Sequence, residues 1–192
     1  MRAFRHWILG AAMIGVAWTA AAEVSVGPRE GLPSDKDYFE ALYTANSLVE
    51  IESYDEAFPW LLKSAEFGDK GSQHLLAVFY YNGYGTEVDF ARAYAWASVA
   101  AESGRHQSRR LRDHIAGLFN TSQLVIGNRV AEIHVEQYGM EARDMVCKTQ
   151  RRRSSALKDV SCYRAHYRNS RYYGPASYCR QNRCERLGGF PR

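Results

Sequence analysis

The chain has 192 residues and a formal net charge of +4. When a predicted N-terminal signal peptide is subtracted, about 170 residues remain, which is enough for one domain with an appendage. We therefore expect a single core and not several domains. The charge is divided unevenly, because residues 23–142 carry 10 basic and 18 acidic side chains, whereas residues 143–192 carry 13 and 3. This asymmetry indicates a basic tail that either docks on its own acidic domain or binds an anionic partner.

Residues 1–22 are predicted to be a secretory signal peptide. Arg2 and Arg5 form a basic start, residues 7–18 are an apolar run, and Ala20-Ala21-Ala22 offers a small-residue cleavage site before Glu23. The alternative is a membrane anchor, but about a dozen apolar residues fall short of the roughly 20 that span a bilayer. We therefore expect a periplasmic or secreted chain with no stable membrane span after cleavage.

Residues 23–37 are predicted to be a flexible leader. Gly27, Pro28, Gly31 and Pro33 lie in this stretch, and it shows no apolar period. Removal of the leader should therefore cost little stability.

An internal repeat dominates the next hundred residues. Residues 57–68 return as residues 93–104, and seven identical pairs keep an offset of 36 positions without a gap. A fixed period of roughly 20 to 50 residues is typical of a solenoid, whose units bury their apolar faces against their neighbours. The pairs are Ala57 and Ala93, Trp60 and Trp96, Ala65 and Ala101, Glu66 and Glu102, Gly68 and Gly104, Ser72 and Ser108, and Leu75 and Leu111.

Each unit is predicted to be a pair of antiparallel helices. Apolar and small residues at i, i+3, i+4, i+7 and i+8 predict a helix over residues 57–65, which Gly68 ends, and a second stripe runs from Ser72 to Tyr80. Small residues opposite large ones allow close packing of the two helices. Residues 82–89 form a glycine-containing loop in which Asp89 caps the next helix.

Further helices complete the predicted array. Residues 37–51 match the second helix of a unit and begin the array, and residues 108–119 continue the array with a further helix. A last helix should follow the N-capping residues Asn120-Thr121-Ser122 and stop at Gly139. The fold class is therefore all-α, a short α/α superhelical solenoid of about six helices.

These residues resemble the Sel1-like repeat, a relative of the tetratricopeptide repeat, over roughly residues 38–138, so we assign residues 38–142 to the repeat domain. Pro59, expected in the first turn of its helix, and the absence of a second Gly-x-Gly loop after Leu111 depart from the pattern. The resemblance implies an adaptor for protein assembly, often in bacterial envelopes, with no catalytic residues to transfer. It rests on Trp60, Ser64-Ala65-Glu66-Phe67-Gly68, Leu75-Leu76-Ala77, Gly83-Tyr84-Gly85, Asp89, Trp96 and Ala100-Ala101-Glu102-Ser103-Gly104.

Residues 143–192 are predicted to be an irregular, basic extension that holds all four cysteines. Export implies an oxidising compartment, so we expect disulfides, and three connectivities are open. We favour the sequence-adjacent choice, Cys147 with Cys162 and Cys179 with Cys184. A zinc site is disfavoured because no Cys-x-x-Cys spacing occurs.

Arginine and tyrosine alternate along this tail. Guanidinium groups bind phosphate or carboxylate and stack on rings, so such an array can grip an anionic polymer. Equally, the tail can be a cystine-pinned extension lying on the acidic solenoid. Export disfavours nucleic acid as the partner. The candidate arginines are Arg151, Arg152, Arg153, Arg168 and Arg171.

The leading functional prediction is a non-enzymatic exported adaptor that binds a protein partner through the repeat surface. Tyr81 and Tyr84 are the candidate contacts, and Tyr84 interrupts a glycine loop where no helical stripe requires it. The alternative is an envelope polyanion binder, for peptidoglycan or anionic lipid, that acts through the tail. The sequence shows no hydrolase motif and no metal-ligand spacing, so we expect no catalytic residues and no cofactor.

Overall fold

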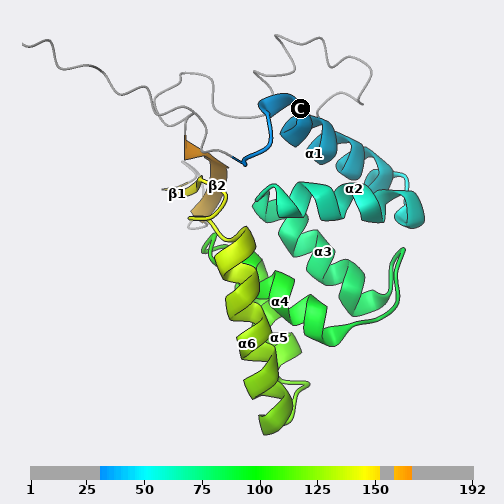
Figure 1. Ribbon diagram of the computed structural model, residues 1–192, viewed down its shortest axis with the longest axis vertical. Coiled ribbons are helices and arrows are strands. Elements are labelled where there is room, and N and C mark those ends of the chain that lie inside the picture. Colours follow the sequence, from blue (N-terminus) through cyan, green and yellow to red (C-terminus); the bar gives the residue numbers. More distant parts are fainter. Residues whose placement is uncertain (1–30, 152–157, 166–192) are drawn as a thin grey trace, which may run out of the picture.

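The computed structural model describes residues 31–151 and 158–165. In these ranges the chain forms six helices followed by a two-stranded antiparallel hairpin (Figure 1). The predicted helical solenoid is confirmed. The elements are α1 Asp35–Glu50, α2 Tyr54–Glu66, α3 Lys70–Asn82, α4 Phe90–Ala101, α5 His106–Ala116, α6 Thr121–Tyr138, β1 Met145–Arg151 and β2 Lys158–Arg164.

Successive helices from α1 to α5 pack against one another, and α6 packs on α4. The small residues of the repeat lie at these contacts, as expected, because a small side chain lets two helix backbones approach closely. Leu61 and Leu76 fill the space between them and are also fully buried. The fully buried alanines of this core are Ala45, Ala57, Ala65, Ala77, Ala93 and Ala97.

Short polar side chains cap four of the described helices, α1, α3, α4 and α6. The Asp89 carboxylate accepts the backbone N–H of Arg92 at 2.9 Å, and Asn120 caps α6, so both predicted caps are confirmed. Asn120 also forms a reciprocal capping box with Gln123. Ser34 caps α1, so this helix begins at Asp35, inside the stretch assigned to the leader. The predicted signal and the first part of that leader lie outside the described residues.

Pro59 lies deeper in its helix than expected. Because α2 begins at Tyr54, Pro59 belongs to the second turn and not to the first. Its missing N–H leaves the carbonyl of Asp55 without the usual helical donor. Both residues are exposed, so water can replace that donor at this position.

The sequence predicted an irregular extension, but the first part of the extension forms a regular hairpin. β1 and β2 pair in antiparallel register with Cys147 directly opposite Cys162, and a disulfide joins the two, which confirms that pairing. Figure 1 places the hairpin between the end of α6 and the start of α1. We name residues 139–151 and 158–165 the strap. Cys179 and Cys184, the other predicted pair, lie outside the described residues.

Arg164 anchors the strap on the first helix. Its side chain is only 3% exposed, and its guanidinium donates to the Asp35 carboxylate at 2.7 Å and to the Pro33 carbonyl at 2.8 Å. It also lies 5.6 Å from the centre of the Tyr38 ring. The Arg105 side chain donates to the carbonyl of Val160 at 3.2 Å. This part of the basic tail therefore docks on its own acidic solenoid, one of the two alternatives left open by the charge distribution.

An ion pair between a buried lysine and a half-buried glutamate holds the other end of the strap. The fully buried Lys70 ammonium donates to the Glu102 carboxylate at 2.8 Å and to the Val99 carbonyl at 2.9 Å. The same carboxylate oxygen accepts the backbone N–H of Met140, just beyond α6, at 2.9 Å. Burial lowers the pKa of Lys70, and its contact with Glu102 opposes that shift.

The repeat glycines after α2 and α4 face different surroundings. Gly68 has φ +101°, and a Cβ there would lie 2.6 Å from the Cβ of Arg143 and 3.1 Å from the Cγ of Met145 in the strap. Gly104 has φ +75°, but a Cβ there would meet nothing within 4 Å. The two positions share a left-handed backbone, and only Gly68 receives the strap.

Replacing each glycine by alanine separates these two roles. Gly104→Ala should cost about 1–2 kcal/mol for the left-handed backbone alone. Gly68→Ala should cost about 1–3 kcal/mol more, because the methyl group collides with the strap. Thermal unfolding by circular dichroism checks this, with a Tm difference between the variants of roughly 4 °C per kcal/mol. Equal Tm values would contradict the docking of the strap at Gly68.

Removing the disulfide should loosen the strap. Cys147 and Cys162 are 15 residues apart in sequence, and a crosslink of that span stabilises a fold by roughly 3 kcal/mol. The double variant Cys147→Ser/Cys162→Ser should therefore lose hydrogen-exchange protection in β1 and β2 first, with the α2 and α3 amides retaining theirs. Unchanged protection of the hairpin amides would show that the crosslink is not what orders it.

Candidate protein-binding groove

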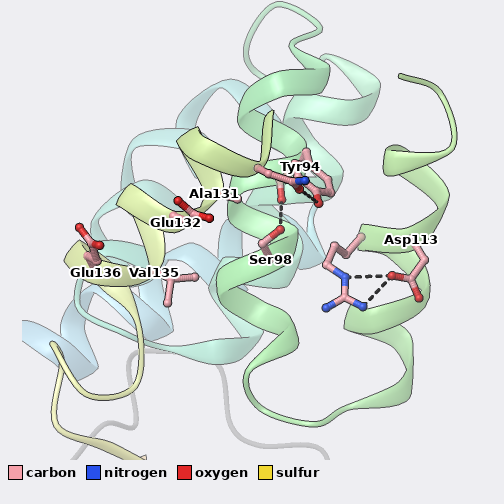
Figure 2. Close-up of a pocket in the computed structure, with 9 residues that line it drawn as sticks. Tyr94, Ser98, Asp113, Ala131, Glu132, Val135 and Glu136 are labelled. Atoms are coloured by element: carbon pink, nitrogen blue, oxygen red, sulfur yellow. Dashed lines mark hydrogen bonds and ion pairs between the residues drawn. The ribbon is translucent and has the colours of Figure 1, made fainter. Parts of the chain in front are cut away.

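The described chain contains an open groove of about 700 Å³ bounded by α4, α5 and α6. Figure 2 shows α4 at its floor, with the side chains of α5 and α6 on opposite sides. The lining combines the aromatic ring of Tyr94 and the aliphatic Ala131 and Val135 with hydroxyl, amide and charged groups. The remaining lining residues are Ser98, Arg112, Asp113, Asn128, Glu132 and Glu136.

The groove exists because α5 and α6 diverge. Each packs on α4, but the two helices make few contacts with each other, whereas α3 and α4 pack extensively. In α3 the fully buried Leu76 and Ala77 belong to the core. Arg112 and Asp113 stand 36 positions later in α5. Because charged groups cannot be buried without large desolvation costs, this side of α5 stays open to water.

Contacts with α4 position the α6 wall. A Cβ at Gly127 would lie 3.2 Å from the Phe119 ring and 3.4 Å from the Tyr94 ring, so α6 approaches closely there. The Tyr94 hydroxyl donates to the side-chain oxygen of Asn128 at 2.6 Å, and Ala131 is buried against the core. These contacts hold the exposed residues of α6 along the groove.

The charges of the groove are mainly acidic. Arg112 pairs with its neighbour Asp113 at 2.7 Å on one wall, and Glu132 pairs with Arg129 at 3.0 Å on the other. No ion pair of the described residues involves the exposed Glu136, which also lines the groove. The lining therefore offers three carboxylates and one guanidinium.

The two tyrosines that the sequence proposed do not line this groove. Tyr84 is 39% exposed and stacks on Tyr54, with ring centres 4.6 Å apart, beside a smaller pocket of about 430 Å³. Tyr81 is half-buried, and its hydroxyl lies 3.0 Å from Nε2 of His114. Both rings take part in intramolecular aromatic contacts, Tyr84 edge-on to Phe79 and Tyr81 edge-on to Phe90.

The arginine candidates of the tail cannot be placed in this site. Arg152, Arg153, Arg168 and Arg171, and the side chain of Arg151, lie outside what the structure describes. Within the described part, no group of three or more histidine, cysteine, aspartate or glutamate side chains could hold a metal ion. None of the described helices combines the length and the apolarity that crossing a bilayer would need.

Comparisons with known proteins support the fold. No family model matches the chain, and no curated protein matches it. One similar solved structure is c5321, described as a protective antigen present in uropathogenic Escherichia coli strains displaying an SLR fold. The match has a TM-score of 0.51 and 25% sequence identity over 56% of this chain. It covers 24% of c5321, so the chain spans about a quarter of that protein's length.

The match to a protein with the SLR (Sel1-like repeat) fold agrees with the 36-residue period and with the packed helix pairs. Sequence identity of 25% over about half of the chain supports a shared architecture. It does not imply that the two proteins bind the same partners. On these grounds, the chain has the Sel1-like repeat fold.

Proposed function

We propose that this chain is a non-enzymatic exported adaptor that binds an extended segment of a protein partner in the groove between α5 and α6. The observation that carries the proposal is the open groove on a rigid α4 floor, which the sequence creates by placing charges where the preceding unit has core residues. Clefts between helices are common places for ligands, and a rigid floor lowers the entropy cost of binding.

The lining supplies contacts suited to a peptide. The Asn128 side-chain oxygen accepts from Tyr94, which leaves its NH₂ group as a donor for a peptide carbonyl. The Ser98 hydroxyl donates to the carbonyl of Tyr94 at 2.8 Å, so its lone pairs can accept a peptide N–H. The half-buried Val135 offers apolar surface to a side chain of the partner.

The chemistry of the groove favours binding over catalysis. Ser98 is its hydroxyl nucleophile candidate, but that hydroxyl donates to a backbone carbonyl and not to a base. The Asp113 and Glu132 carboxylates are each engaged by an arginine on the same helix. An oxidising compartment fits the Cys147–Cys162 disulfide, which supports export and thus the envelope or exterior as the place of action.

The polyanion alternative draws less support from the described tail. Arg164 is buried against Asp35, and the Arg143 guanidinium lies 5.2 Å from the centre of the Tyr138 ring. Both guanidinium groups therefore already make contacts within the molecule. An anionic envelope polymer would have to be bound by arginines outside the described residues, so the groove is the stronger candidate.

Site-specific photo-crosslinking tests the adaptor proposal. A photoreactive amino acid at Asp113 or Glu136, on opposite walls, should capture the same partner in cells, because both side chains line the groove. The matched control is Glu40, an exposed acidic residue of α1 outside the groove, which should not capture it. Ser98→Trp, which fills the floor, should abolish capture from both walls while leaving the circular dichroism spectrum unchanged. Equal capture from all three positions would overturn the proposal.

A further inference from the structure

The last segment of the chain, residues 166–192, is strongly basic. It contains six arginines and one glutamate, and tyrosines lie next to or near several of the arginines. A guanidinium forms bidentate hydrogen bonds with a carboxylate, and a tyrosine ring covers apolar surface at low entropy cost. A surface that fits this segment therefore needs several carboxylates beside aliphatic or aromatic groups.

The groove has this composition. Glu132 and Glu136 lie one helical turn apart on α6, and Asp113 lies on the opposite side of α4, on α5 (Figure 2). Val135 and the Tyr94 ring line the same groove. Arg112 is the single cation in the lining, and it is engaged by Asp113. Asp113 pairs with Arg112 and Glu132 with Arg129 at the surface, so a guanidinium of the segment would share or replace these contacts, whereas Glu136 takes part in no ion pair of the described residues. With its excess of carboxylates and its apolar surface, the groove complements the arginine and tyrosine pattern of the segment.

The segment also starts close enough to reach the groove. The backbone N–H of Ala165 donates to the carbonyl of Asp144 at 2.7 Å, so the two residues are adjacent. Asp144 is eight residues beyond Glu136 in sequence, which places the two Cα atoms within roughly 28 Å of each other. The 27 residues that follow Ala165 can span up to roughly 90 Å when extended. Reach is therefore no obstacle.

The strap provides a precedent for this mode of binding in the same chain. Arg164, the residue before Ala165, is already held by a carboxylate of the solenoid at 2.7 Å. The interface between basic tail and acidic helices therefore exists immediately before the segment begins. Continuing that interface along the solenoid extends an established contact.

From these observations we infer that residues 166–192 bind in the groove of their own solenoid and compete there with the partner. The intramolecular contact stands on charge, composition and reach alone, whereas the competition rests on the proposed function. Because the contact is electrostatic and exposed to solvent, it weakens as the salt concentration rises. A partner must then displace the tail, and high ionic strength favours that exchange.

Nuclear magnetic resonance of the ¹⁵N-labelled chain from Glu23 to Arg192 tests the contact. The variant Arg168→Gln/Arg171→Gln/Arg180→Gln/Arg183→Gln should shift backbone amides around Asn128 and Glu136, and 500 mM NaCl should shift the same amides of the unaltered chain. The amide of Glu40 on α1 should not move. Shifts that are independent of protein concentration support binding within one chain, whereas concentration-dependent shifts would overturn it in favour of a second copy.

A second experiment approaches from the groove side. A fluorescent peptide of residues 166–192, with serine at both cysteines, should bind the four-arginine variant, whose own tail is weakened. Glu132→Gln/Glu136→Gln in that background should reduce the affinity roughly three- to tenfold at low salt, because two exposed charge pairs are lost. The control Glu40→Gln/Glu87→Gln removes two exposed acidic groups elsewhere and should leave the affinity unchanged.

The outcomes separate the two proposals. If the groove amides do not respond to the tail substitutions, or both glutamate pairs weaken the peptide equally, the tail contact is wrong even if photo-crosslinking finds a partner in the groove. If the tail contact is found but no partner is captured from the groove walls, the tail contact stands and the adaptor function fails. Enhanced crosslinking in the four-arginine variant would establish the competition.

Discussion

The ion pair between the fully buried Lys70 and the half-buried Glu102 is the contact on which the course of α6 and the start of the strap depend. An ammonium removed from water destabilises the fold unless it is paired, so Lys70 requires a carboxylate at this place. Glu102 supplies it from the end of α4 and also accepts the backbone N–H of Met140, beyond α6. One carboxylate therefore connects α3, α4 and the exit of α6, and the direction of α6 sets both the groove and the start of the strap.

In this chain the residues of the repeat motif also serve to dock the C-terminal strap. Glu66 and Glu102 occupy the same place in successive units, and Glu102 accepts the backbone N–H of Met140 in the strap. Burial raises the pKa of Glu66, and the positive charge of Arg143 in the strap opposes that shift. Gly68 leaves room for Arg143, whereas Gly104 faces open space. Residues that resemble a common pattern for building helix pairs also provide the docking surface for the extension.

The features that could be predicted from the sequence are those that local periodicity and spacing determine. The 36-residue period gave the helix pairs, and the register of β1 and β2 bears out the pairing of Cys147 with Cys162. Sequence reasoning missed the hairpin because Arg164 and Asp35, whose contact anchors the hairpin, are 129 residues apart. The tyrosines that the sequence proposed, Tyr81 and Tyr84, lie outside the groove, which periodicity does not predict because it arises from the divergence of two helices. The change from Leu76 and Ala77 to Arg112 and Asp113 at equivalent positions was the available signal.

A double-mutant cycle on Lys70→Met and Glu102→Gln, followed by native-state hydrogen exchange, tests this account most directly. Glu102→Gln alone should destabilise the protein more than the double variant does, because it leaves the buried ammonium without a counter-charge. Protection should fall first at the Met140 amide, the end of α6 and β1, while the α2 amides keep theirs. Additive effects of the two substitutions, with protection lost evenly across all helices, would contradict the claim that this pair directs the C-terminal half.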